Sequence, residues 1–121
     1  MSRVEKELSC ADGCAVKLFA TELRRVRAGA GLPYRELAKR AHYSHSSLVR
    51  AASGESLPTW DVTEAFLKAC RTPRSELPAW QQLWNVVDEL TRPGRPLDLR
   101  SELSDCLEQV RAFSQGRGAT A

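Results

Sequence analysis

The side chains best suited to chemistry in this sequence stand together in one short polar segment. They are the outward residues of an expected helix that buries Leu48 and either Ala51 or Ala52, namely His45, Ser46, Ser47, Val49 and Arg50. Arginine can bond guanine through two hydrogen bonds, serine can donate or accept, and valine can contact a thymine methyl group. The combination favours reading of base edges in the DNA major groove. A polar face is also what any exposed helix has, and helical bundles can bind proteins instead.

The modest net charge of +3 hides a strongly basic segment. Seven basic residues and a single acid, Glu36, lie between Leu23 and Arg50, whereas the stretch from Glu55 to Leu90 has six acids and three bases. A segment of this kind suits a polyanion, because neutralised phosphates release their condensed counterions. A solvated helix face with unpaired charges is the alternative interpretation of the charge alone.

The four cysteines raise the possibility of a second kind of chemistry. Cys10 and Cys14 are one helical turn apart and could offer two thiolates on one face, so a redox or metal-responsive role is an alternative. Zinc sites usually have two closely spaced ligand pairs, whereas Cys70 and Cys106 are isolated on apolar helix positions and are expected in the core. We therefore expect no metal and no cofactor. The sequence has no nucleophile–base pair, paired acidic motif or phosphate loop, so an enzyme is not expected.

Helices must position these residues, and the apolar spacing predicts helices throughout and no convincing strand. Apolar residues recur at helical intervals, and the expected helices cover residues 16–28, 33–41, 45–52, 60–70, 76–90 and 97–113. Gly29 and Gly31 are expected to end the first helix, and Ser44 and Thr59 to cap the third and fourth. The expected buried stripe of the fourth helix is Val62, Ala65, Phe66 and Ala69.

The chain is expected to form an all-α helix-turn-helix domain followed by one further helix. The expected parts are a leader (1–16), the domain (17–90), a linker (91–96), a C-terminal amphipathic helix (97–113) and a disordered tail (114–121). Proline and glycine in the linker are its strongest turn signal. The chain shows no secretory signal and no apolar run long enough for a membrane span, so a cytoplasmic protein is expected.

The segment from Leu23 to Ala69 resembles the lambda-repressor/Cro-like family, also called the xenobiotic-response-element (XRE) family, of helix-turn-helix transcriptional regulators. The matching positions are Leu23-Arg24, Arg27, Ala30-Gly31-Leu32, Glu36-Leu37-Ala38-Lys39-Arg40-Ala41, Ser44-His45-Ser46-Ser47-Leu48, Arg50, Gly54 and Pro58. The sequence around these positions, together with Trp80-x-x-x-Trp84, is similar to that of regulators abundant in actinomycetes. The resemblance implies a five-helix all-α domain that binds double-stranded DNA sequence-specifically.

Carried over residue by residue, the resemblance assigns two sets of DNA contacts. Base reading falls to His45, Ser46, Ser47, Val49 and Arg50. Phosphate contacts fall to Tyr34, Arg35, Lys39, His42, Tyr43 and Ser44. The arginines of the first helix, with Arg40, are assigned to phosphates or solvent.

The chain departs from the family pattern at three positions near the turn. Pro33 replaces the usual serine cap, at a cost of up to about 1 kcal/mol. Tyr34 stands where the family often has a phosphate-binding glutamine, and a tyrosine hydroxyl can still donate to phosphate with a different geometry. His42 replaces a glycine that usually adopts a left-handed conformation, at a cost of about 1 kcal/mol.

The expected function is transcriptional regulation from a DNA operator. One helix reads few base pairs, so a homodimer on a palindromic site is expected. The sixth helix, through Leu99, Leu103, Leu107 and Val110, is expected to pack on the domain or on a second copy, or to dock a partner protein. The alternative is a protein-interaction adaptor, antitoxin-like or anti-sigma-like, on the same fold. No pocket for a small ligand is recognisable in the sequence.

Overall fold

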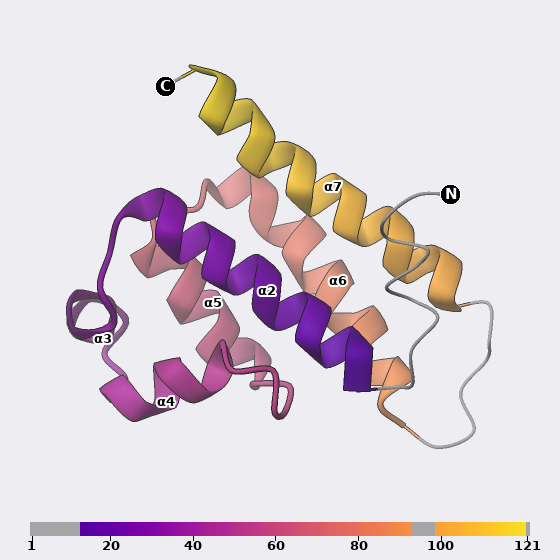
Figure 1. Cartoon of the computed structure of the whole chain (residues 1–121), viewed down its shortest axis with the longest axis horizontal. Coiled ribbons are helices and arrows are strands. Elements are labelled where there is room, and N and C mark those ends of the chain that lie inside the picture. The colour runs from indigo at the N-terminus through magenta and orange to yellow at the C-terminus, as the bar shows by residue number, and fades with distance from the viewer. Residues whose placement is uncertain (1–12, 93–98, 121) are drawn as a thin grey trace.

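The computed structural model describes residues 13–92 and 99–120, with side chains for residues 15–92 and 99–113. In this part the chain is all-α, as predicted, and has no strand. Its elements are α2 (Gly13–Ala30), α3 (Tyr34–Ala41), α4 (His45–Ala51), α5 (Trp60–Ala69), the 3-10 turn η1 (Arg74–Glu76), α6 (Leu77–Leu90) and α7 (Leu99–Thr120) (Figure 1). Residues 1–12 of the expected leader and 93–96 of the expected linker lie outside the described residues.

The helices form two groups. The first group is α2, α6 and α7, which pack on one another, and the second is α3, α4 and α5. Helix α6 also contacts α5, so one core runs through both groups. Figure 1 shows α2 crossing the molecule with α7 on one side and the short helices α3 and α4 on the other.

Large apolar side chains fill the interior at positions that the helical spacing predicts. Phe19, Leu37, Leu48, Phe66 and Leu83 have no exposed surface. Phe19 of α2 meets the buried Trp80 of α6 edge to face, with ring centroids 6.0 Å apart. Such pairs contribute about 0.5–1.5 kcal/mol beyond the burial of their area. Leu37 of α3 and Leu48 of α4 point into the core, and their burial determines which side chains of these helices face outward.

Three helices end in the same way, with one residue in the left-handed conformation. Gly31 ends α2 at a φ of +68°, and its N–H donates to the carbonyl of Ala28. His42 ends α3 at a φ of 61°, and Arg71 ends α5 at a φ of 64°. This closure satisfies helix carbonyls that would otherwise have no partner. Glycine adopts it freely, whereas a residue with a Cβ atom costs roughly 1–2 kcal/mol.

The first helix differs from the prediction at both ends. Helix α2 begins at Gly13, inside the expected leader and three residues before the expected start. Gly29 lies within α2, and Gly31 alone ends it.

The buried face of α5 is rotated by one residue from the prediction. Phe66 and Ala69 are buried as expected, but Thr63 and Leu67 are buried where Val62 and Ala65 were expected. Thr63 tolerates burial because its hydroxyl donates to the carbonyl of Thr59 at 2.9 Å. Val62 and Ala65 lie half-buried at the edge of the core.

Helix α7 packs on its own chain. Leu103, Cys106, Leu107 and Val110 are buried against α6 and α2. Of the three expected roles of this helix, packing on the domain is therefore the one that occupies its apolar face. The backbone of α7 continues as a helix to Thr120, beyond the expected end of the helix at Phe113. No proline interrupts residues 114–120, and glycine costs only about 1 kcal/mol in a helix.

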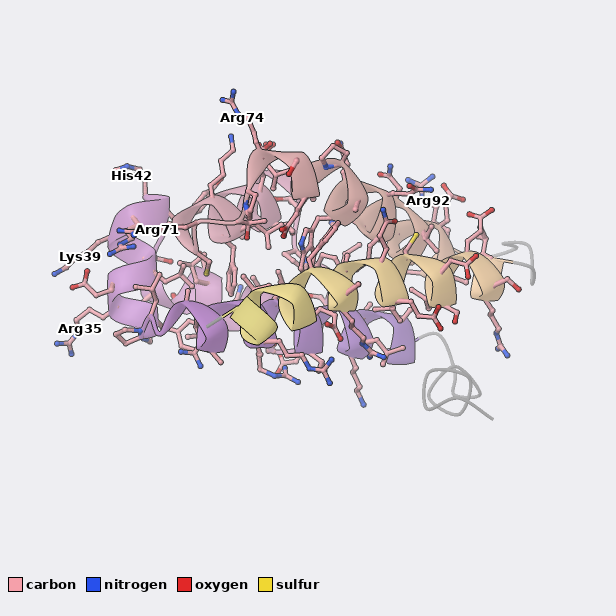
Figure 2. All side chains as sticks on the ribbon, turned by 90° about the horizontal axis from the view of Figure 1, so that it is seen from above. Arg35, Lys39, His42, Arg71, Arg74 and Arg92 are labelled. Atoms are coloured by element: carbon pink, nitrogen blue, oxygen red, sulfur yellow. The ribbon has the colours of Figure 1, made fainter. Side chains whose placement is uncertain are left out.

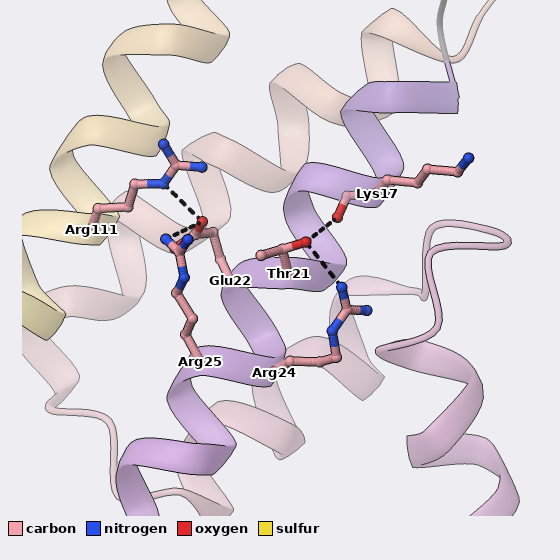
Figure 3. A network of polar contacts seen from close by, with 6 residues as sticks. All are labelled: Lys17, Thr21, Glu22, Arg24, Arg25 and Arg111. Atoms are coloured by element: carbon pink, nitrogen blue, oxygen red, sulfur yellow. Dashed lines mark hydrogen bonds and ion pairs between the residues drawn. The ribbon is translucent and has the colours of Figure 1, made fainter. Parts of the chain in front are cut away.

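A buried ion pair joins α7 to α2 across 89 positions of sequence. Glu22 is 1% exposed, and its carboxylate accepts from Nε of Arg111 at 2.8 Å and pairs with Arg25 at 3.1 Å (Figure 3). A buried carboxylate needs such partners, because its desolvation is costly. The pair therefore fixes how α7 lies against the rest of the molecule.

Candidate nucleic-acid interface

Helix α4 begins with a serine that caps it and braces its first turn. Ser44 has extended backbone, and its hydroxyl oxygen accepts from the N–H of Ser47 at 3.1 Å. The same hydroxyl donates to Oγ of Ser47 at 2.8 Å, so the predicted cap is confirmed. Ser44 was also predicted to contact phosphate, and its hydroxyl would do so from a position that the cap already fixes.

Helix α4 points its predicted reading residues into solvent. Leu48 and Ala51 are buried, and Ala52, just beyond the helix, is buried as well. The outward side chains are His45, Ser46, Ser47, Val49 and Arg50, each of them exposed. Val49 is 38% exposed and Tyr43 is 37% exposed, and these are the exposed large apolar side chains within the described part of the chain. An apolar side chain offered to solvent beside polar ones suits contact with a thymine methyl group.

Arg50 is the strongest candidate base reader on this face. It lies in the last turn of α4 and is exposed, and among the described residues its guanidinium has no acidic partner. An unpaired guanidinium keeps all its donors for a ligand, and its planar fork matches the acceptor edge of guanine.

The start of α4 leans on Tyr34, the first residue of α3. The rings of Tyr34 and His45 meet edge to face, with centroids 6.1 Å apart. The guanidinium carbon of Arg27 lies 4.4 Å from the centroid of the Tyr34 ring, and Nη1 of Arg27 donates to the carbonyl of Leu32 at 2.7 Å. Tyr34 is half-buried in this stack. The Tyr34 ring therefore positions His45, independently of what the Tyr34 hydroxyl binds.

Three arginines of α2 form polar contacts within the protein, and two of them bond the backbone next to α3 and α4. Arg24 donates to the carbonyl of Ala52 at 2.6 Å and to Thr21, and Figure 3 shows its side chain beside Thr21. Arg25 pairs with Glu22, and Arg27 with the carbonyl of Leu32. Arg24 and Arg25 are exposed and Arg27 is half-buried, so the assignment of these arginines to phosphates or solvent stays a prediction. Each has a partner within the protein because helix ends and a buried carboxylate require donors.

The loop after α4 is fixed by two contacts that the sequence did not reveal. Gly54 has a φ of +86° and is buried on α2, where an added Cβ atom would lie 3.3 Å from Cγ of Lys17. The indole N–H of Trp84 donates to the carbonyl of Pro58 at 2.8 Å, and the ring meets Trp60 edge to face. The first contact joins this loop to α2, and the second joins it to α6.

Basic side chains of α3 extend the candidate interface. Arg35 and Lys39 are exposed, one helical turn apart, and His42 is exposed at the turn (Figure 2). Lys39 pairs with Glu36 at 3.7 Å, a solvent-exposed pair that a phosphate can displace at small cost. Arg35 has no acidic partner among the described residues, so its charge is available.

The described cysteines are neutral core residues. Burial raises the pKa of Cys70 to about 11, although Arg27 and Arg40 act in the opposite direction. Burial also raises the pKa of Cys106, together with the nearby carboxylates of Glu102 and Asp105. Cys10 lies outside the described residues, as does the side chain of Cys14, so the pair behind the redox alternative is not part of this description. Residues 13–92 and 99–120 contain no group of three metal-binding side chains and no helix able to cross a membrane.

Comparison with known proteins gives one match. Residues 18–80, more than half of the chain, match a family described as a helix-turn-helix domain. This range begins in α2 and ends at Trp80 of α6, so it contains α3, α4 and α5 entirely. No curated protein and no solved structure matches the chain.

Proposed function

This chain belongs to the helix-turn-helix domain family, and from that membership we propose that it is a transcriptional regulator of the XRE type that binds double-stranded DNA sequence-specifically. Helix α4 is the reading helix in this proposal, and it enters the major groove. The observation that carries it is the outward face of α4, where five exposed side chains able to read bases stand on a helix fixed at both ends.

Rigid support is what makes this face suitable for reading. Direct readout requires side chains to reach base edges at hydrogen-bonding distance. The helix that carries them must therefore be fixed in position and orientation. The Ser44 cap and the Tyr34 ring hold the start of α4, and the Arg24 bond to Ala52 holds its end. Arg50 would contact guanine, Val49 a thymine methyl group, and Ser46 and Ser47 either partner of a base pair.

Phosphate contacts in the proposal come from the residues that flank α4. Arg35 and Lys39 lie on the exposed face of α3, and Tyr43 and Ser44 come just before the reading helix. Such contacts set the position of the protein on the duplex and carry most of the salt dependence. Tyr34 is proposed chiefly to position His45, with its hydroxyl at the edge of the phosphate set.

Two copies on a palindromic operator would supply enough contacts for specificity. The apolar face of α7 is filled by its own chain, and on the described surface the exposed large apolar side chains are Tyr43 and Val49, beside the DNA face. We therefore propose that the homodimer assembles on DNA rather than through α7. Light scattering of the free protein should give a monomer, and native mass spectrometry with operator DNA should give two chains per duplex.

The experiment that tests DNA binding is selection of duplexes from a random pool, followed by titration at several salt concentrations. We expect an enriched sequence with two related half-sites, and binding to it that weakens steeply as salt rises. Each phosphate contact adds about 0.9 to the slope of log affinity against log salt. Recovery of no preferred sequence, with affinity equal for selected and random duplexes, would contradict the proposal.

A further inference from the structure

A second basic site lies where α3 and α5 end. An open pocket of about 490 Å³ is lined there by four basic residues, Arg40, His42, Lys68 and Arg71, and by no acidic residue. Its remaining lining is alanine, from α3 and α5. A neighbouring hollow of about 240 Å³ shares Arg40 and Arg71, so the two form one continuous basic surface. No residue of α4 lines either hollow.

Little within residues 13–92 and 99–120 neutralises this charge. Lys68 pairs with Glu64 at 3.8 Å, in an exposed contact. Arg40 and Arg71 are exposed and have no acidic partner in the part of the chain that the structure describes. Cys70 borders the second hollow as a neutral thiol, because burial raises its pKa to about 11. The pocket therefore offers several cationic donors to an anion over a small apolar floor.

The backbone at this pocket gives an independent indication. In the described residues, the non-glycine residues with positive φ are His42 and Arg71, and both line the pocket. At the equivalent position α2 has Gly31, the residue this conformation favours. A preference for cations near helix C-termini explains Arg40 and Lys68. Helix closure accounts for the left-handed backbone at His42 and Arg71, but not for the presence of a basic side chain where glycine is favoured, and such outliers gather at ligand sites.

We propose that this pocket binds a small anion carrying phosphate or carboxylate groups. Arg71 reaches from the end of α5 toward α3, and His42 stands at the end of α3, so the anion would bridge the two helices (Figure 2). The pocket volume falls within the range of about 300–1,000 Å³ that is typical of small-molecule sites. No residue of the α4 reading face lines the pocket, and His42 is the residue that it shares with the predicted phosphate contacts.

The test is an NMR titration of the full chain with pyrophosphate and, separately, with citrate. We expect saturable shifts of the backbone amides of His42, Ala69 and Arg71. The Arg71→Gly variant should weaken binding by about tenfold or more, since it removes a charged donor. Glycine accepts the left-handed backbone, so this variant is expected to fold at least as stably as the native chain.

Arg74→Ala is the matched control. Arg74 is exposed three residues further along the chain and points away from the pocket, so its loss should change anion affinity by less than about twofold (Figure 2). The absence of saturable shifts with both probes, or equal affinity in the native chain and Arg71→Gly, would overturn the proposal. It would also be overturned if Arg71→Gly lowered the salt slope of DNA binding by about one, because a DNA phosphate would then occupy the pocket.

Discussion

Replacing His42 with glycine should stabilise this protein, although the residue is exposed and makes no hydrogen bond through its side chain in the described structure. His42 has a φ of 61° and a ψ of 36°, in the left-handed region. Its backbone N–H already donates to the carbonyl of Ala38 at 3.0 Å, and that bond would remain in the variant. The change therefore removes the strain of a Cβ atom and leaves the helix closure intact.

The size of the effect follows from two opposing terms. Relief of the left-handed strain contributes roughly 1–2 kcal/mol. The greater freedom of glycine in the unfolded chain takes back about 0.4–1 kcal/mol. The expected gain in the free energy of unfolding is about 0.5–1 kcal/mol, or roughly 2–5 °C in Tm for a chain of this size.

Thermal unfolding followed by circular dichroism measures this gain. His42→Ala is the matched control, because alanine keeps the Cβ atom and its strain while losing the imidazole. We expect the Tm of His42→Gly to exceed that of His42→Ala by more than the Tm of His42→Ala differs from that of the native chain. A glycine variant less stable than the alanine variant would refute the reasoning, because the imidazole or an unseen contact would then outweigh the backbone.

Three further predictions concern the supports of the fold and the interface. Arg111→Ala should lower the free energy of unfolding in urea by about 2–3 kcal/mol, because the buried Glu22 carboxylate keeps only Arg25 of its two arginine partners. Arg100, which is exposed on α7, provides the control. A loss no larger than that of Arg100→Ala would exclude this role for Arg111. Ser44→Ala should cost about 1 kcal/mol through loss of the cap, and an unchanged urea midpoint would speak against it. Cys70 has a pKa raised to about 11 by burial, so its thiolate forms only above the neutral range. Iodoacetamide at about pH 8 should therefore modify Cys70 only after unfolding, and mass spectrometry of the native protein would reveal any exception.

The reading helix could be predicted from sequence because local rules determine it. Leu48 sets the inward direction, Ser44 is a strong cap, and the helical period then places the outward residues. The left-handed residue at His42 was also predictable, since the turn needs one whatever side chain occupies it. These features depend on neighbours within a few positions.

Features that depend on distant contacts could not be predicted in this way. The sequence shows Arg24 and Arg27 only as basic residues, whereas the structure uses them to bond carbonyls of Ala52 and Leu32. The rotation of α5 depends on one hydroxyl bond of Thr63, which lets a polar residue take a core position. The basic pocket requires the ends of α3 and α5 to meet, which the sequence does not show. Arg71, a basic residue at a helix end where glycine is favoured, gives no indication of this by itself.

The most direct test of DNA reading by α4 is the affinity of Arg50→Ala for the selected duplex, measured by fluorescence anisotropy beside Arg74→Ala. Loss of a bidentate arginine contact should cost about 1–3 kcal/mol, or roughly 5- to 150-fold in Kd, and relax the preference at one base pair of each half-site. Arg74→Ala removes the same charge far from α4 and should change Kd by about twofold at most. Unchanged affinity and base preference in Arg50→Ala, or an equal loss in both variants, would contradict the assignment of α4 as the reading helix.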